Sequence, residues 1–304
     1  MRLSRTLFAV LFAFLMVLSA LLLPALPASS ANVTNVTLSV TSGPPGTMVT
    51  ITGSGFTAPS FTVTFGSMQV VPTTTIAGGA ISAVFAVPGL PRATYNVTVT
   101  AAGDTVNTPT FTITPDITIN RSSGVVGDTV TVSGNGFSAS ALITILFDGA
   151  SIITTNSNSY GAFYDATFTV LATRAGWHTI SARDSVGSAS GEVYIVSPQI
   201  TLSTNTTSVG STVTCTGNGF AGSSSVSFSL DGTAISGIAN TNANGSFSTI
   251  SLTIPSIAAG NHTFQARDSS GNSVTAVVTI NSVITISPDN GPAGTTITIT
   301  GSGF

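Results

Sequence analysis

Residues 46–56 read GTMVTITGSGF, and closely similar stretches return as GDTVTVSGNGF at 127–137, GSTVTCTGNGF at 210–220 and GTTITITGSGF at 294–304. The closing phenylalanines are Phe56, Phe137, Phe220 and Phe304, which gives a period of 81–84 residues. Self-similarity at a fixed period predicts a tandem array, and this period is about the length of one small β-sandwich.

The copies also align outside this signature. Residues 170–178 read VLATRAGWH, residues 254–262 read IPSIAAGNH, and residues 87–95 read VPGLPRATY, without a gap between them. Three loop glycines, Gly79, Gly161 and Gly245, fall in the same register. The repeat therefore extends over whole domains and is not confined to one short motif.

The second copy predicts about seven short strands. Polar and apolar residues alternate, or apolar residues cluster, in segments at 116–120, 129–134, 141–147, 151–155, 166–171, 178–183 and 191–198. Asp148-Gly149 favours a tight hairpin with positive φ, and residues 156–161 form a polar loop. Because no later segment has a helical period, the sequence predicts an all-β chain of tandem immunoglobulin-like β-sandwiches.

Five segments follow from this alignment: a signal peptide at 1–31, a first repeat at 32–115, a second at 116–198, a third at 199–283, and the truncated start of a fourth at 284–304. The joints Thr114-Pro115-Asp116 and Ser197-Pro198-Gln199 are short, which favours a semi-rigid array. We expect the natural protein to continue past 304, and residues 284–304 to expose Ile297, Ile299 and Phe304.

The first 31 residues resemble an export signal. Arg2 and Arg5 precede an apolar run over 7–23, and small residues end the segment at Ala31. We predict a helical signal peptide cleaved after Ala31; an uncleaved N-terminal anchor is the alternative. Either outcome predicts a secreted or cell-surface protein.

Composition excludes several classes of function. Charged residues make up 6% of the chain, and its net charge is −3, so no basic surface for nucleic acid or anionic lipid is expected. Cys215 is the single cysteine and occupies the position of Ile51 and Val132 in other copies, which predicts a core residue and no internal disulfide.

The stretches GPPGTMVTITGSGF (43–56) and GPAGTTITITGSGF (291–304) resemble the N-terminal signature of IPT/TIG domains. Copies two and three lack the proline of the opening turn. The resemblance implies immunoglobulin-like domains of prokaryotic surface proteins that serve as spacers, adhesive modules or accessory domains, with no shared catalytic residue. The structural repeat signature comprises Gly53, Gly55, Phe56, Gly134, Gly136, Phe137, Gly217, Gly219, Phe220, Gly301, Gly303 and Phe304.

No motif for catalysis, cofactor binding or a metal centre emerges. His178 and His262 stand where the first copy has Tyr95, and the acids nearest in sequence that could serve a reactive site are Asp184 and Asp268. We interpret both histidines as half-buried strand residues and most aspartates as turn residues. Calcium at the repeat junctions stays open, although no EF-hand-like loop is present.

These observations predict an exported cell-surface structural or adhesive protein whose repeats act as a semi-rigid stalk or interaction array. The alternative is a glycan-binding or accessory repeat region of a larger secreted hydrolase. Tyr160 and Trp177 are its candidate ligand contacts, because the third copy has Asn244 and Asn261 there. Expected partners are cell-envelope or extracellular proteins or glycans, with no nucleic acid and no membrane contact beyond an uncleaved signal.

Overall fold

The computed structural model describes residues 33–187 and 189–304, and this part of the chain consists of strands, turns and bends without a helix. The predicted all-β class is therefore confirmed. The predicted helical signal peptide at 1–31 lies outside the described residues. No described helix has the length and apolarity needed to cross a membrane.

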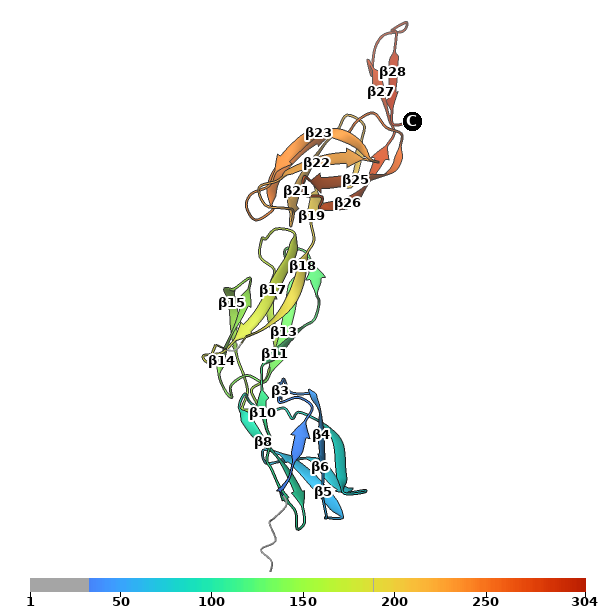
Figure 1. The fold of residues 1–304 in the computed structure, drawn as a ribbon. Helices are drawn as coiled ribbons and strands as arrows, with labels where there is room; N and C mark the ends of the chain where they lie inside the picture. Colours follow the sequence, from blue (N-terminus) through green and yellow to red (C-terminus); the bar gives the residue numbers. More distant parts are fainter. Residues whose placement is uncertain (1–32, 188) are drawn as a thin grey trace, which may run out of the picture. The chain divides into compact units, whose positions relative to one another are not determined.

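The second repeat folds into two sheets around one core (Figure 1). One sheet has the strand order β11-β13-β16 and the other β12-β18-β17-β14-β15. The bounds are β11 (Asp116–Ile119), β12 (Ser123–Gly124), β13 (Thr129–Asn135), β14 (Leu142–Phe147), β15 (Ala150–Asn156), β16 (Phe163–Thr169), β17 (Gly176–Arg183) and β18 (Ala189–Val196).

Alternation along these strands creates the core of the second repeat. On β13, Val130 and Val132 are buried while their neighbours are partly exposed, as a strand with one covered face requires. Buried side chains from both sheets belong to one cluster, among them Ile117, Val130, Val132, Phe168, Ile143, Ile145, Ile180 and Val196. The expected β-sandwich is thus present.

The β14–β15 hairpin has the turn that the sequence predicts. Asp148 and Gly149 separate the two strands and have φ values of 50° and 80°. Positive φ at both central residues matches the right-handed twist of the flanking strands. Aspartate tolerates this conformation better than most residues, and glycine adopts it freely.

Two features of the second repeat differ from the sequence prediction. Strand β12 lies within 122–128, between the predicted strands at 116–120 and 129–134, and pairs in parallel with β18. Strand β16 begins at Phe163, three residues before the predicted 166, because a β-bulge places Tyr164 and Asp165 opposite Ser133. The bulge interrupts the alternation that sequence reading depends on.

The third repeat has the same arrangement, with sheets β19-β21-β24 and β20-β26-β25-β22-β23. Cys215 on β21 is fully buried in its core, as predicted, and burial raises the pKa of its thiol to about 12. The strands are β19 (Gln199–Leu202), β20 (Thr206–Ser208), β21 (Thr212–Asn218), β22 (Ser225–Leu230), β23 (Thr233–Asn240), β24 (Phe247–Thr253), β25 (Gly260–Asp268) and β26 (Ser273–Asn281).

The first repeat contains sheets β2-β4-β7 and β3-β10-β8-β5-β6 and a parallel pair, β1–β9. Its strands are β1 (Val33–Thr34), β2 (Val36–Leu38), β3 (Ser42–Gly43), β4 (Met48–Ser54), β5 (Ser60–Phe65), β6 (Met68–Thr75), β7 (Ala80–Ala86), β8 (Thr94–Ala101), β9 (Thr105–Val106) and β10 (Thr110–Ile113). The parallel pairing of β3 with β10 corresponds to that of β12 with β18.

Residues after the third repeat form an antiparallel pair, β27 (Val283–Ser287) and β28 (Thr298–Ser302). Ile297, Ile299 and Phe304 are exposed here, as expected from the sequence, and Phe304 is 76% exposed. Its counterparts Phe137 and Phe220 are fully buried.

The first signature glycine makes room for the buried aromatic rings. A Cβ atom on Gly134 would lie 2.5 Å from the Phe163 ring and 2.9 Å from the Phe137 ring, closer than real contacts allow. The two rings pack with centroids 5.5 Å apart. Glycine at this position lets the signature phenylalanine fold back under the strand that precedes it.

We predict that Phe137→Ala lowers the free energy of unfolding of the second repeat by about 3–5 kcal/mol, because a fully buried ring is lost and a cavity remains. Phe304→Ala is the matched control at the same motif position, and its effect should stay within about 0.5 kcal/mol. Denaturant unfolding of each variant measures both values. A loss below about 1 kcal/mol for Phe137→Ala would contradict the anchoring role.

Candidate functional site

A histidine at the start of β17 ties a hairpin turn to a loop. His178 is buried, its Nδ1 atom lies 2.6 Å from Asp148 Oδ2, and its Nε2 atom lies 2.9 Å from the Arg174 carbonyl oxygen. Its ring also stacks on Phe147 with centroids 4.9 Å apart. The other Asp148 oxygen accepts the backbone N–H of Thr179. The ring therefore fixes the 171–176 loop to the sandwich.

This arrangement recurs in all three repeats with a paired change of residues. In the third repeat, His262 contacts Asp231 at 2.6 Å and the Ala258 carbonyl at 2.9 Å. In the first repeat, the Tyr95 hydroxyl donates to the Pro91 carbonyl, and glycine, Gly66, stands at the position of the aspartate. The Tyr95 contact is the tyrosine corner of immunoglobulin-like sandwiches, and the histidines take its place.

The histidine partners are not the acids nearest in sequence. Asp184 and Asp268, which the sequence offered as neighbours, lie at the far end of the same strands and bond other groups. Asp184 Oδ2 accepts the backbone N–H and the hydroxyl of Ser138, and Asp268 Oδ2 accepts the N–H of Ala221. Residues about 46 positions apart are thus joined across the sandwich, which a local turn interpretation did not anticipate.

Hydrogen bonds keep these carboxylates ionised. Burial alone would raise the pKa of Asp148, but the bonds from His178 and the Thr179 N–H outweigh it and lower that pKa. Burial would likewise raise the pKa of Asp268, but the hydrogen bonds from Ala221 and Asn272 outweigh burial and lower that pKa. The His262 bond, followed by the Thr263 N–H, lowers the pKa of Asp231. These acids are structural acceptors and not proton donors.

The second signature glycine faces the preceding repeat. The larger of the two compact units of the chain comprises Val40–Met48, Ala86–Tyr95 and Phe111–Phe304. Within it, a Cβ atom on Gly219, at φ +68°, would lie 2.6 Å from the Ser197 carbonyl oxygen. The Phe220 carbonyl accepts the N–H of Ala175 at 2.9 Å. Signature residues therefore contribute to the joint as well as to the core.

The two predicted ligand contacts are exposed but lie on different elements. Tyr160 is 61% exposed in the loop between β15 and β16, where its N–H donates to Asn158 Oδ1. Trp177 is 76% exposed on β17, in register with Ile195 of β18. Asn244 makes the same bond to Asn242 as Tyr160 makes to Asn158, which supports the alignment of these positions. Their role as ligand contacts stays a prediction.

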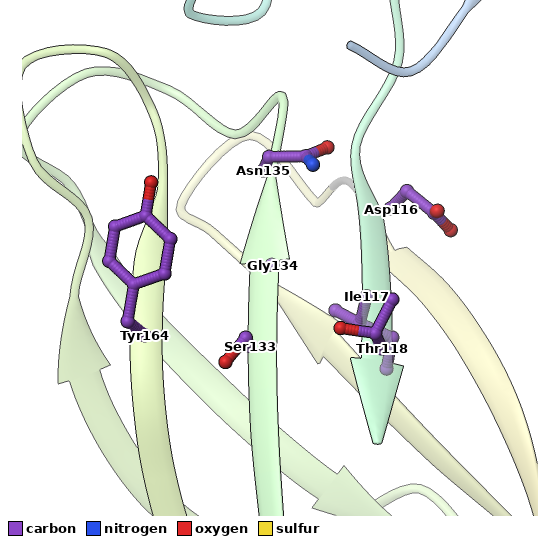
Figure 2. Close-up of a pocket in the computed structure, with 7 residues that line it drawn as sticks. All are labelled: Asp116, Ile117, Thr118, Ser133, Gly134, Asn135 and Tyr164. Atoms are coloured by element: carbon purple, nitrogen blue, oxygen red, sulfur yellow. The ribbon is translucent and has the colours of Figure 1, made fainter. Parts of the chain in front are cut away.

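A small groove opens on the outer face of the three-stranded sheet of the second repeat (Figure 2). It has a volume of about 150 Å³, and its floor is the backbone of β11 and β13. Figure 2 shows Tyr164 on one side of β13, with Asp116 and Thr118 of β11 on the other. Ser133 and Asn135 of β13 complete its polar side chains.

One polar atom in this groove lacks a partner. The Asn135 Oδ1 atom is buried and has no hydrogen-bond partner among the described residues. Such an unsatisfied acceptor costs roughly 1–3 kcal/mol, so its presence calls for an explanation. Sequence reasoning missed this groove, although an aromatic residue directly after the inward-facing Phe163 was an available signal.

The described residues 33–187 and 189–304 contain no group of three or more His, Cys, Asp or Glu side chains placed to hold a metal ion. Carboxylate and imidazole bonds in these residues brace loops, and the second repeat carries a shallow polar groove with an aromatic wall. The bonds support structure, and the groove is suited to contact with a ligand.

Comparison with known protein families gives a match to the first repeat. Residues 31–113 match the sequence model of the IPT/TIG domain. This match confirms the resemblance for the first repeat, and the internal alignment relates the second and third repeats to it. No curated protein sequence matches the chain.

Solved structures similar to the chain include the Escherichia coli adhesin FdeC (15% identity, TM-score 0.24, covering 82% of this chain and 96% of that one). Others are a tetra-tandem repeat from the extending region of a large adhesion protein (17%, 0.29, 85% and 77%) and a Bacteroides ovatus mixed-linkage glucan protein, SGBP-B, in complex with a heptasaccharide (15%, 0.29, 83% and 70%). TM-scores this low carry no inference about function.

The His262 corner predicts a pH dependence for the third repeat. The Asp231 bond, and then the Ala258 carbonyl, raise the pKa of His262 above 6.5, because both ring nitrogens face acceptors that only the imidazolium satisfies together. A raised folded-state pKa gives stability that is present below the unfolded value and lost as pH rises through the folded one. Denaturation midpoints should therefore fall from pH 6 to pH 8.

The control is the double variant Asp231→Gly with His262→Tyr, which installs the first-repeat pair. Its phenol does not titrate in this range, since burial raises the pKa of the corresponding Tyr95 above its usual value of 10.0. The pH dependence should be reduced in this variant. An equal slope in both proteins would show that the corner is not its source.

Proposed function

We propose that this protein is an exported cell-surface protein whose immunoglobulin-like repeats form a semi-rigid, non-catalytic stalk or interaction array. We assign the three sandwiches to residues 32–115, 116–198 and 199–283. The observation that carries the proposal is the repetition of the joint: the signatures that pack the cores of the second and third repeats also contact the preceding repeat. The IPT/TIG match of residues 31–113 and the export-like leader support a location outside the cell.

Equivalent backbone bonds stand at successive joints within the larger compact unit. The N–H groups of Arg92 and Ala175 donate to the carbonyls of Phe137 and Phe220, each at 2.9 Å. The His178 and Tyr95 rings hold the loops that carry these N–H groups. A loop that is held on its own sandwich and bonded to the next one resists bending better than a flexible linker.

Solution scattering tests the stalk. Three sandwiches end to end should give a rod on the order of 100–130 Å long, from about 3.3 Å per strand residue plus loops. A compact particle, or an ensemble of freely jointed beads, would contradict the proposal. The measurement uses the protein without any glycan or protein ligand, so its result does not depend on a binding activity.

We predict that Gly219→Ala loosens the joint between the second and third repeats. Alanine at φ +68° costs about 1–2 kcal/mol, and its Cβ atom would also press on the Ser197 carbonyl. Gly55→Ala is the matched control, because Gly55 has φ +88° but open space around its Cβ position. Scattering of Gly219→Ala should show a broader distance distribution, while Gly55→Ala keeps the original one. Identical profiles would mean that the glycine serves only the turn.

Glycan binding is the second candidate function. Exposed aromatic side chains favour it, since Tyr160, Tyr164 and Trp177 are replaced by Asn244, Ser248 and Asn261 in the third repeat and are therefore not required by the fold. Aromatic rings with one apolar face and a polar edge are enriched at recognition surfaces. Binding of the purified chain to an array of oligosaccharides tests this function, and an array without signal at high protein concentration contradicts it.

A further inference from the structure

We propose that the groove between β11, β13 and Tyr164 in the second repeat is a binding site for one ring of a neutral pyranose glycan. The inference rests on the second candidate function and names a site for it that differs from Tyr160 and Trp177. Four observations carry it: the register of the polar side chains, the placement of Tyr164, the unpartnered oxygen of Asn135, and the charges nearby.

Strand register places the polar groups on one face. Asp116 lies directly opposite Asn135, and Thr118 lies opposite Ser133. Between them, the Ile117 side chain and the Cβ position of Gly134 face the core. A carboxylate, an amide and two hydroxyls therefore stand within two residue pairs, offering both donors and acceptors to the hydroxyls of a sugar.

Tyr164 is held out from the sheet by its backbone. It is 69% exposed although it belongs to β16, because the bulge places it and Asp165 together opposite Ser133. Asp165 has φ 54°, and its N–H donates to Ser133 Oγ at 3.1 Å. Bulges commonly redirect a side chain at a functional position. The ring is thus an exposed platform beside the polar row, suited to stacking on the C–H face of a pyranose.

The Asn135 Oδ1 atom is buried beside the groove and is an acceptor that the described residues do not use. Rotation of the Asn135 side chain would turn this oxygen toward the groove, where a sugar hydroxyl would supply the missing bond. Buried polar atoms without partners are rare in native proteins, so each one calls for an explanation. Asp116 and Asn135 are cross-strand partners, and Figure 2 shows the Asn135 amide on the side of β13 that is nearer to β11.

Charge and size limit the ligand. Asp116 lines the groove and Asp165 follows Tyr164, so two carboxylates disfavour uronic acid, sialylated or sulfated sugars. A volume of about 150 Å³ is well below that of pockets that enclose drug-sized molecules, roughly 300–1,000 Å³. The groove suits a terminal or single internal ring of a neutral glycan, with the rest of the chain in solvent.

The repeats supply natural control residues. The third repeat keeps the asparagine, as Asn218, but has Ser248 in place of Tyr164 and Gln199 in place of Asp116. Tyr164→Ser therefore installs a residue that the fold already accepts at this position. Tyr160→Asn and Trp177→Asn do the same at the two other exposed aromatics of the repeat.

The experiment screens the full chain on neutral gluco-, manno-, xylo- and galacto-oligosaccharides beside sialylated, sulfated and uronate-containing glycans. Calorimetric titration with the best neutral oligosaccharide then compares the variants. Tyr164→Ser should raise Kd by about tenfold or more, as expected when a central aromatic contact is lost, with an unchanged melting temperature. Leu142→Ser, which installs the third-repeat residue Ser225 at an exposed position, is the matched control and should stay within about twofold of the original Kd. Tyr160→Asn and Trp177→Asn distinguish the groove from the two ligand contacts that the sequence predicts.

Each other outcome overturns a distinct statement. Binding that survives Tyr164→Ser but is lost in Trp177→Asn or Tyr160→Asn refutes the groove and leaves glycan binding in place. Preference for acidic glycans refutes the neutral ligand. Absence of all glycan binding refutes both the groove and the second candidate function, while the scattering test of the stalk is unaffected.

Discussion

Each repeat depends on its signature phenylalanine, whose ring packs in the core and whose backbone forms hydrogen bonds to neighbouring loops. In the second repeat the Phe137 ring is buried against Phe163, its N–H donates to the Gly161 carbonyl, and its own carbonyl accepts the N–H of Arg92. One residue therefore joins the hydrophobic core, the loop before β16 and the preceding repeat. Hydrophobic burial of the ring provides most of the stabilisation, and the two backbone hydrogen bonds fix the orientation of the residue. Selection on any one of these contacts would preserve the same short stretch of sequence.

The tyrosine and histidine corners show how the repeats diverge without losing an interaction. The ring at the start of the strand reaches a carbonyl four residues earlier, and in the first repeat the Tyr95 hydroxyl donates to it. Histidine has a second nitrogen to satisfy, and in both repeats that contain it the hairpin turn provides an aspartate, Asp148 or Asp231. The first repeat has Gly66 there. The change is therefore coupled between two positions about 30 residues apart.

Periodicity and alternation predicted the all-β class, the β14–β15 turn and the buried position of Cys215, because each of these depends on local pattern. Strand β12 was missed because Ser123 and Gly124 carry no strand pattern and are placed by backbone pairing with Ile195 and Val196. Tyr164 was missed because the bulge places two consecutive residues outward. The partner of His178 was missed because turn and strand meet only in the folded sandwich. Tertiary contacts, and not propensities, decide these three features.

The parallel pairing of β12 with β18 has a mechanical consequence. Tension along the chain enters the second repeat near β11 and β12 and leaves it through β18, so the two paired strands are pulled in opposite directions. The Ile195 and Ser197 N–H groups donate to the carbonyls of Ser122 and Gly124, across that direction of pull. Such bonds are loaded in shear and must break together, whereas a hairpin pulled from one end opens one bond at a time. A parallel pair of only two residues thus resists a pull between the two ends of the repeat.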